Sequence, residues 1–198
     1  MADGARLNHR FAQLRPRSER EYVMTLPITT ERLILRRYTQ ADIQDVVAFA
    51  AHPSVASATP DFEATESGVK AYIDLQNSYQ PFEKGKCFDL AIELKEKSKV
   101  IGLLSLVCND DKQGEIGYAL GVDYRGRGLA TESTAALIEY GFTTLGLHRI
   151  QAETDSSNPR SWQLMQRVGM KREGRLREAK FRDGKWFDKL IYGILGED

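Results

Sequence analysis

The chain has only two cysteines among its 198 residues, Cys87 and Cys108. They lie far apart and match no metal-binding or redox spacing, so we expect reduced thiols in a cytoplasmic protein and no metal site. No apolar run approaches the ~20 residues that a membrane-spanning helix needs. The N-terminus also lacks the apolar segment of a signal peptide. These absences exclude a disulfide-stapled secreted domain and a helical membrane protein.

An excess of either charge is missing as well. Lysine plus arginine and aspartate plus glutamate both number 28, so the formal net charge is zero. The chain therefore has no global attraction to nucleic acid or to a membrane surface, and we expect neither as a partner. Hydrophobic residues make up 41% of the chain and charged residues 28%, which is ordinary for a globular protein.

The first 26 residues differ from the rest, because arginines stand there among few large apolar side chains. We expect a flexible tail over residues 1–26 and a single domain over 27–198. Two alternatives for the tail stay open. Either its arginines contact ribosomal RNA, or Met24 is the natural start of the protein.

The most informative segment runs from Glu115 to Thr131, where an apolar strand leads through an arginine- and glycine-rich turn into a helix. A helix start carries unpaired N–H groups and about half a positive charge, so it attracts anions. Glycines at Gly126 and Gly128 let the backbone close around a phosphate, and flanking arginines add charge. A tight turn with two solvated arginines is the alternative. Dinucleotide and P-loop motifs do not fit, because Thr131 replaces the third glycine and no Gly-Lys-Ser/Thr follows.

Periodicity and caps predict the remaining elements. We expect strands over residues 32–38, 88–94, 100–107, 114–122 and around 150–154, and a closing hairpin that turns at Asp183-Gly184. We expect helices after a capping box at Thr39–Asp42, from about residue 65, over 128–145, and from an N-cap at Asn158 to Gly169. This order gives an α/β fold with a mixed sheet and helices on both faces.

The segment Arg125-Gly-Arg-Gly-Leu-Ala130 resembles the (Arg/Gln)-x-x-Gly-x-(Gly/Ala) signature of the GNAT superfamily of acetyl-CoA-dependent N-acetyltransferases. Leu147–Ile150 and Asn158–Trp162 follow in the order and spacing of the branch that includes the RimJ and RimL ribosomal-protein acetyltransferases. Thr30–Arg36 is similar to the opening strand of that branch. The resemblance covers residues 27–195. It implies the GNAT fold, with a mostly antiparallel sheet, and acetyl-CoA as cosubstrate.

The resemblance also implies the residues that bind acetyl-CoA. Backbone groups of Leu120, Gly121 and Val122 would face the pantetheine arm and the acyl carbonyl. Main-chain N–H groups of the phosphate loop would hold the pyrophosphate, which assigns Arg125, Gly126, Arg127, Gly128, Leu129 and Ala130. Asn158 would hydrogen-bond the pantetheine, and it is also expected to cap a helix.

Acyl transfer to an amine needs a base for the amine proton and an acid for the leaving thiolate. For the base we choose Glu115, which matches a position where GNAT relatives carry a carboxylate; a plain surface carboxylate is the alternative. Glu178 is the competing base, although the position that matches relatives most closely reads Lys180. For the acid we choose Ser161, which matches a serine that relatives aim at the thioester sulfur. His148 has the features of a structural residue near a helix C-terminus.

The acceptor is constrained mainly by proton chemistry. A protein α-amino group has a pKa near 7.7–8.0 against about 10.4 for lysine, so its deprotonation at neutral pH costs about 1 kcal/mol instead of about 4 to 5. A single carboxylate therefore suits an N-terminal amine, with ribosomal-protein N-termini as the candidate by resemblance. Polyamines, amino acids and aminoglycosides remain alternatives, as does a sensor that binds acetyl-CoA without transferring the acetyl group. A monomer and a homodimer are both compatible with the sequence.

Overall fold

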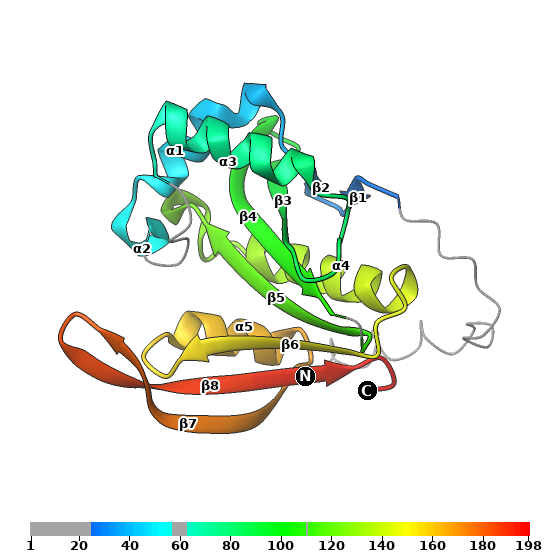
Figure 1. Ribbon diagram of the computed structural model, residues 1–198, viewed down its shortest axis with the longest axis vertical. Helices are drawn as coiled ribbons and strands as arrows, with labels where there is room; N and C mark the ends of the chain where they lie inside the picture. The colour runs from blue at the N-terminus through cyan, green and yellow to red at the C-terminus, as the bar shows by residue number, and fades with distance from the viewer. Residues whose placement is uncertain (1–24, 57–62, 110) are drawn as a thin grey trace.

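A computed structural model describes residues 25–56, 63–109 and 111–198. An eight-stranded sheet with the order β1-β2-β3-β4-β5-β6-β8-β7 runs through them (Figure 1). Its strands are β1 Ile28–Thr29, β2 Leu33–Arg36, β3 Cys87–Leu94, β4 Lys99–Cys108, β5 Gln113–Leu120, β6 Arg149–Asp155, β7 Lys171–Arg182 and β8 Lys185–Leu195. Neighbouring strands are antiparallel except β5 and β6, which are parallel. The predicted mixed, mostly antiparallel sheet is confirmed.

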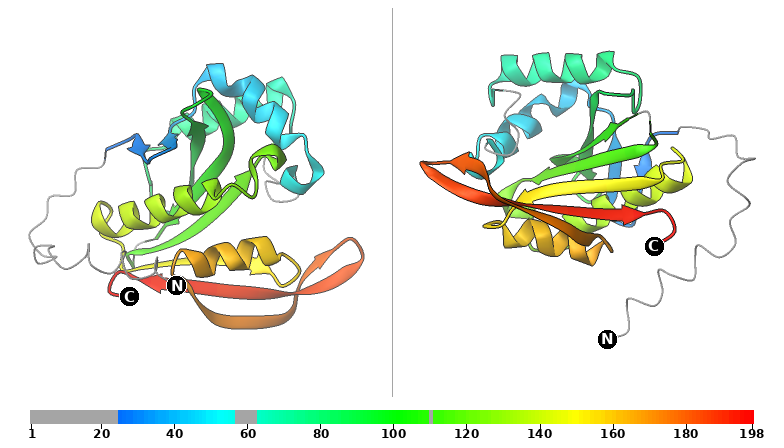
Figure 2. Two further views of the ribbon diagram at one scale, coloured as in Figure 1. Left: turned by 180° about the vertical axis from the view of Figure 1, so that it is seen from behind. Right: turned by 60° about the horizontal axis from the view of Figure 1, so that its bottom comes forward.

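Helices cover both faces of this sheet, as the sequence predicts. The α-helices are α1 Ile43–Ala50, α2 Pro53–Ala56, α3 Glu66–Ser78, α4 Leu129–Thr143 and α5 Pro159–Arg167, and two 3-10 turns are η3 Gln40–Asp42 and η4 Val122–Tyr124. In Figures 1 and 2, α1 and α3 lie on one face while α4 and α5 lie on the other. We call these the α1/α3 face and the α4/α5 face.

The helix starts are capped, at Thr39 and Asn158 as predicted and at Thr65 in addition. Thr65 Oγ1 accepts a hydrogen bond from Gly68 N at 3.1 Å and so caps α3. Asn158 Oδ1 accepts from Ser161 N at 3.2 Å at the start of α5. At Thr39 the return half of the capping box is present, because the Asp42 carboxylate accepts from the Thr39 backbone N–H at 2.7 Å. Each cap satisfies backbone groups that the helix itself leaves unpaired.

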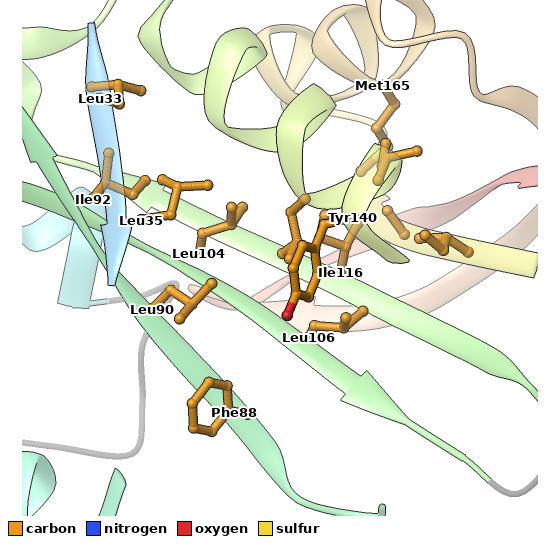
Figure 3. Close-up of a cluster of buried hydrophobic side chains, with 14 of the residues drawn as sticks. Leu33, Leu35, Phe88, Leu90, Ile92, Leu104, Leu106, Ile116, Tyr140 and Met165 are labelled. Carbon is orange, nitrogen blue, oxygen red and sulfur yellow. The ribbon is translucent and has the colours of Figure 1, made fainter. Parts of the chain in front are cut away.

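The core consists of two apolar clusters, one on each face of the sheet. On the α4/α5 face, Leu106 and Ile116 from β4 and β5 pack beside Tyr140 of α4 (Figure 3). On the α1/α3 face, Phe49 and Ile73 cover the central strands. Because side chains alternate along a strand, even-numbered residues of β5 face α4 and α5, and odd-numbered ones face α1 and α3.

Three short elements were not predicted. β1 is only two residues long, η4 is a three-residue 3-10 turn, and α2 is a single turn that begins at Pro53. His52 belongs to this turn, since its Nδ1 accepts from the Ser54 backbone N–H at 3.2 Å. Elements this short carry no periodic pattern. The predicted tail lies almost wholly outside the described residues, which begin at Thr25.

Candidate functional site

The central feature of the site is a V-shaped opening in the sheet between β5 and β6. These strands pair only where residues 113–115 lie beside 149–151. Beyond Glu115 they diverge, as Figure 1 shows. From residue 116 to 120, the edge of β5 that faces β6 therefore has no described strand beside it. Such an edge presents backbone N–H and C=O groups to a ligand, much as it would to another strand.

The phosphate loop closes the upper end of β5 and leads into α4. Gly126 and Gly128 both have φ +77°, a conformation that glycine adopts without strain. Gly128 is the N-cap of α4 and supplies no capping side chain. The first N–H groups of this 15-residue helix are therefore left for an external acceptor. This geometry fits an anion such as a pyrophosphate.

Three arginines surround the loop without a carboxylate partner among the described residues: Arg125, Arg127 and Arg160. The pKa of Arg125 is lowered, first by burial and then by the positive charge of Arg160. Arg125 Nε donates to the Leu120 carbonyl at 2.9 Å, so this guanidinium also fixes the loop to the end of β5. Arg127 lies 5.9 Å over the Tyr124 ring. Like charges held together in this way favour an anionic ligand.

A clamp from the N-terminal segment holds the loop in place. Arg32 pairs with Glu132 in the first turn of α4, with Nε 2.6 Å from Oε2, and its NH1 donates to the Arg127 carbonyl at 2.9 Å. Thr30 Oγ1 adds a hydrogen bond to Glu132 at 2.6 Å. Burial alone would raise the pKa of Glu132, but the bonds from Thr30 and Arg32 hold it below its ordinary value. The clamp neutralises a carboxylate that would otherwise repel an anion.

Several of the backbone groups that the resemblance assigns to acetyl-CoA binding already have hydrogen-bond partners within the protein. Gly121 N–H donates to the Ile101 carbonyl at 2.8 Å and so belongs to the sheet. The Gly121 carbonyl accepts from Tyr124 N at 3.0 Å, and the Val122 carbonyl accepts from Arg125 N at 3.2 Å. The side-chain oxygen of Asn158 is used in capping α5, as predicted.

Ser161 is buried in the first turn of α5 and reaches across the V to β5. Its Oγ lies 2.9 Å from the Tyr118 hydroxyl, which is also 3.1 Å from the Ser161 carbonyl oxygen. Tyr118 is an even-numbered residue of β5, so this pair lies on the α4/α5 face. The serine assigned as acid is thus held by a tyrosine that the sequence analysis did not single out.

Glu115 lies on the opposite, α1/α3 face and is exposed. Parallel pairing places it beside Gln151, whose Nε2 donates to Glu115 Oε2 at 3.2 Å. Glu115 forms no ion pair with any described residue. The two carboxylates of the neighbouring strand β6 do form ion pairs. Glu153 pairs with Lys189 at 2.6 Å, and Asp155 pairs with Arg182 at 2.8 Å. Glu115 is therefore a carboxylate beside the V without a cationic partner among the described residues.

The competing candidates lie elsewhere. Glu178 is exposed at an irregularity of β7, with φ +50°, and its backbone N–H donates to Asp188 at 2.9 Å. Lys180 lies 4.0 Å from Asp155. His148 is exposed just before β6, and its backbone N–H donates to the Lys112 carbonyl at 2.7 Å.

Comparison with known proteins identifies the family. The family described as "Acetyltransferase (GNAT) domain" matches residues 32–171, which spans the loop, the V and α5. The chain belongs to the GNAT acetyltransferases. The N-acetyltransferase YnaD of Bacillus subtilis is 30% identical to this GNAT chain over 172 residues, covering 86% of it and 98% of YnaD. It follows that the chain is an acetyl-CoA-dependent N-acetyltransferase.

Two further relatives extend the likeness over nearly the whole GNAT chain. A crystal structure of a GNAT acetyltransferase from Bacillus anthracis matches with a TM-score of 0.76 and 25% identity, covering 87% of this chain and all of that one. The Escherichia coli [ribosomal protein uS5]-alanine N-acetyltransferase is 26% identical over 187 residues, which is 90% of this chain and 95% of the relative. The predicted fold and superfamily are confirmed.

Sequence reasoning found the loop but missed the residues that position it and its neighbours. Tyr118, Gln151 and the Arg32–Glu132 clamp act through contacts between distant segments, for which a single sequence gives no local signal. Two absences apply to the described residues: they include no group of three metal-ligating side chains and no helix long and apolar enough to cross a membrane.

A hollow of about 260 Å³ between α5 and the β7–β8 hairpin is separate from this site. Its lining comprises Ser156, Trp162, Gln166, Arg172, Arg175, Leu190 and Tyr192. Trp162 and Gln166 are four residues apart and share the flank of α5 that faces the hairpin. Ser161 instead faces β5, so α5 divides the hollow from the V.

Proposed function

We propose that this GNAT enzyme acetylates the N-terminal amine of a protein, by direct attack of the amine on acetyl-CoA in a ternary complex. The proposal places it with the RimJ and RimL type of ribosomal-protein acetyltransferase. The observation that carries it is the position of Glu115: an exposed carboxylate beside the V, free of any described cation, on the face of β5 opposite to Ser161.

In this proposal, the base and the acid lie on opposite faces of β5. Glu115 lies toward the side from which the amine approaches, and Ser161 lies toward the side where the thiolate departs. Residues 115 and 118 are about 10 Å apart along the strand. Glu115 therefore takes the amine proton through a short water chain rather than by direct contact. Backbone N–H groups on the open edge of β5 are the donors available for the developing oxyanion.

Acetyl-CoA, when bound, supplies an activated acyl group as a thioester. In this proposal the phosphate loop, residues 125–130, holds the pyrophosphate with N–H groups at the start of α4. Arg127 and Arg160 add positive charge around it. Leu120 and Val122 at the end of β5 lie along the path from the loop to the V, where they contact the pantetheine arm. Ser161 donates to the sulfur, and Asn158 holds the start of α5.

The acceptor class follows from the proton cost and from the likeness to the uS5-alanine acetyltransferase. An α-amino group is deprotonated at neutral pH for about 1 kcal/mol, which one carboxylate and water can provide. A lysine side chain costs about 4 to 5 kcal/mol unless burial lowers its pKa. Within the described residues, the Glu115 side of the V has no second unpaired carboxylate on β6 to assist.

The test is acceptor-dependent release of free thiol from acetyl-CoA. The panel contains peptides that begin with alanine or serine, the same peptides with a blocked N-terminus, spermidine, free amino acids and an aminoglycoside. We expect release with the free peptides and none with the blocked ones. Mass spectrometry should then place the acetyl group on the α-nitrogen.

Release only with spermidine, an amino acid or the aminoglycoside would replace the proposed acceptor with a small-molecule amine. Release from blocked peptides that contain lysine would move the acceptor to a side chain. Tight acetyl-CoA binding without release from any acceptor would contradict an N-terminal acetyltransferase of these peptides and favour a sensor.

A further inference from the structure

The number of protons on Tyr118 and Ser161 limits how the hydrogen bonds between these two residues can be arranged. The Tyr118 oxygen lies 2.9 Å from Ser161 Oγ and 3.1 Å from the Ser161 carbonyl oxygen. A phenol carries one proton, and a carbonyl oxygen only accepts. When Tyr118 donates to the carbonyl, the Ser161 hydroxyl donates back to Tyr118. When Tyr118 donates to Ser161 Oγ instead, the Ser161 proton is available for a third group.

The surroundings of the pair keep the tyrosine proton in place. Burial raises the pKa of Tyr118, while the Ser161 hydrogen bond and the charge of Arg167 oppose that rise. Tyr118 is therefore a neutral donor at neutral pH. Ser161 is fixed from the other side as well, because its backbone N–H donates to the Asn158 cap. The two hydroxyls thus form a held pair that bridges the V from β5 to α5.

We propose that Tyr118 is a positioning residue for acyl transfer, holding the Ser161 hydroxyl in the V and turning its proton toward the departing sulfur. This inference rests on the proposed function, in which Ser161 faces the thioester. Hydrogen bonds in a chain polarise one another. A Ser161 hydroxyl that accepts from Tyr118 is consequently a stronger donor than a serine hydroxyl by itself.

The protons balance over one turnover. The amine nitrogen forms a bond to the acetyl carbon, and the carbon–sulfur bond breaks with its electron pair on sulfur. The nitrogen of an α-ammonium group loses two protons, one before the attack and one from the tetrahedral intermediate, and both leave through Glu115 to solvent. Ser161 gives its proton to sulfur and takes one back from solvent, while Tyr118 keeps its own proton. Two protons leave to solvent and one enters, so the products are the amide, a neutral thiol and one released proton.

The decisive experiment does not need turnover. Free coenzyme A is bound to the protein, and its thiol is titrated through the ultraviolet absorbance of the thiolate. Donors aimed at sulfur stabilise the thiolate and lower its pKa. We expect Tyr118→Phe to raise the pKa of the bound thiol by about 1, and Ser161→Ala by about 1 to 2. The double variant should match Ser161→Ala, because Tyr118 acts through Ser161.

An unchanged thiol pKa in Tyr118→Phe would overturn the proposal, since a purely structural tyrosine would give that result. Tyr79→Phe is the matched control, because Tyr79 loses the same hydroxyl but lies beyond α3, where Lys86 stacks on its ring. Should Tyr118→Phe fold poorly, Ser161→Ala removes the contact between the two hydroxyls and leaves only the bond from Tyr118 to the backbone carbonyl. The pKa of its bound thiol must then exceed that of the wild-type protein.

Steady-state kinetics provide a second test of the role of Tyr118. With an accepted amine, we expect Tyr118→Phe to lower kcat about 10-fold and leave the KM for acetyl-CoA unchanged. In a Ser161→Ala background the same substitution should have little effect. Equal losses in both backgrounds would show that Tyr118 acts independently of Ser161. If the wild-type protein acetylates nothing in the panel, the proposed function fails, while the thiol titration still decides the role of Tyr118.

Discussion

Arg32 and Glu132 are 100 residues apart in sequence, yet Arg32 binds the Glu132 carboxylate through both its backbone N–H, at 2.9 Å, and its guanidinium, at 2.6 Å. The same guanidinium contacts the Arg127 carbonyl in the phosphate loop. The turn between β1 and β2 thereby fixes the start of α4, and it does so where the negative charge of Glu132 would otherwise oppose anion binding.

We expect Arg32→Met to weaken acetyl-CoA binding about 10-fold, or about 1.4 kcal/mol, because the loop loses its clamp and Glu132 its counter-charge. Isothermal titration calorimetry measures the change. Arg175→Met is the matched control, since it removes another exposed arginine–carboxylate pair, with Asp188, on the distant hairpin. Equal affinity in wild-type and Arg32→Met protein would contradict the clamp.

Gly128→Glu should abolish measurable acetyl-CoA binding, because it adds bulk, negative charge and backbone strain at the N-cap of α4. Gly184→Glu separates these effects. Gly184 has nearly the same φ, +75° against +77°, and lies in the open turn of the β7–β8 hairpin. Both variants carry the same strain, so only the loop variant should lose binding. Retained affinity in Gly128→Glu would rule out this loop as the pyrophosphate site.

Glu115→Gln should lower the rate of acetyl transfer at pH 7 by about 100-fold and leave acetyl-CoA affinity unchanged, because it removes a base but no cosubstrate contact. Single-turnover kinetics and calorimetry measure the two quantities separately. Glu153→Gln is the comparison, since Glu153 is a carboxylate on the same face that pairs with Lys189. A larger loss in Glu153→Gln than in Glu115→Gln would assign the base to Glu153.

Asp155→Asn should lower the free energy of unfolding at pH 7 by about 1 to 3 kcal/mol. Asp155 is buried, and burial alone would raise its pKa. Bonds from Ser157 and Arg182, and the nearby Lys180 charge, lower the pKa below its ordinary value. Because the pKa of Asp155 is lower in the folded protein than in the unfolded one, where it is near 3.9, its carboxylate stabilises the fold at pH values above 3.9. This contribution is lost as the pH falls through the pKa of the folded protein.

Urea unfolding at pH 7 and near pH 3 measures this effect of Asp155. The difference between wild-type and Asp155→Asn protein should shrink at the lower pH. Asp74→Asn is the control, because Asp74 forms a solvent-exposed i,i+4 ion pair with Lys70. The free energy of unfolding of this variant should hardly differ from that of the wild-type protein. A stability difference that stays constant with pH would contradict an ionised, bonded Asp155.

Most elements were predictable because each leaves a local trace. Thr65 and Asn158 cap the helices that they precede in the sequence, and Asp183 and Gly184 have the positive φ values, +49° and +75°, that a tight hairpin turn needs. The structural predictions that were wrong or missing are of two kinds. β1, α2 and η4 are too short for any period, and β2 and β5 end two residues earlier than predicted, at Arg36 and Leu120, although β3 and β4 continue beside them.

The candidate site divides in the same way. Local sequence alone pointed to the phosphate loop, because glycines with positive φ, arginines and a helix start are neighbours in the chain. Glu115 and Ser161 came from resemblance, and the sequence could not say what surrounds them.

The sequence by itself determined most of the helices and strands, the sheet class and the glycine- and arginine-rich loop before α4, since these depend on residues within about one helical turn or strand of each other. Only the tertiary structure decided that β5 and β6 diverge after Glu115, that Tyr118 holds Ser161 across the opening, and that Arg32 clamps Glu132. Those contacts join segments that are 36 to 100 residues apart in sequence. Packing of the whole sheet brings them together, and no local pattern encodes that packing.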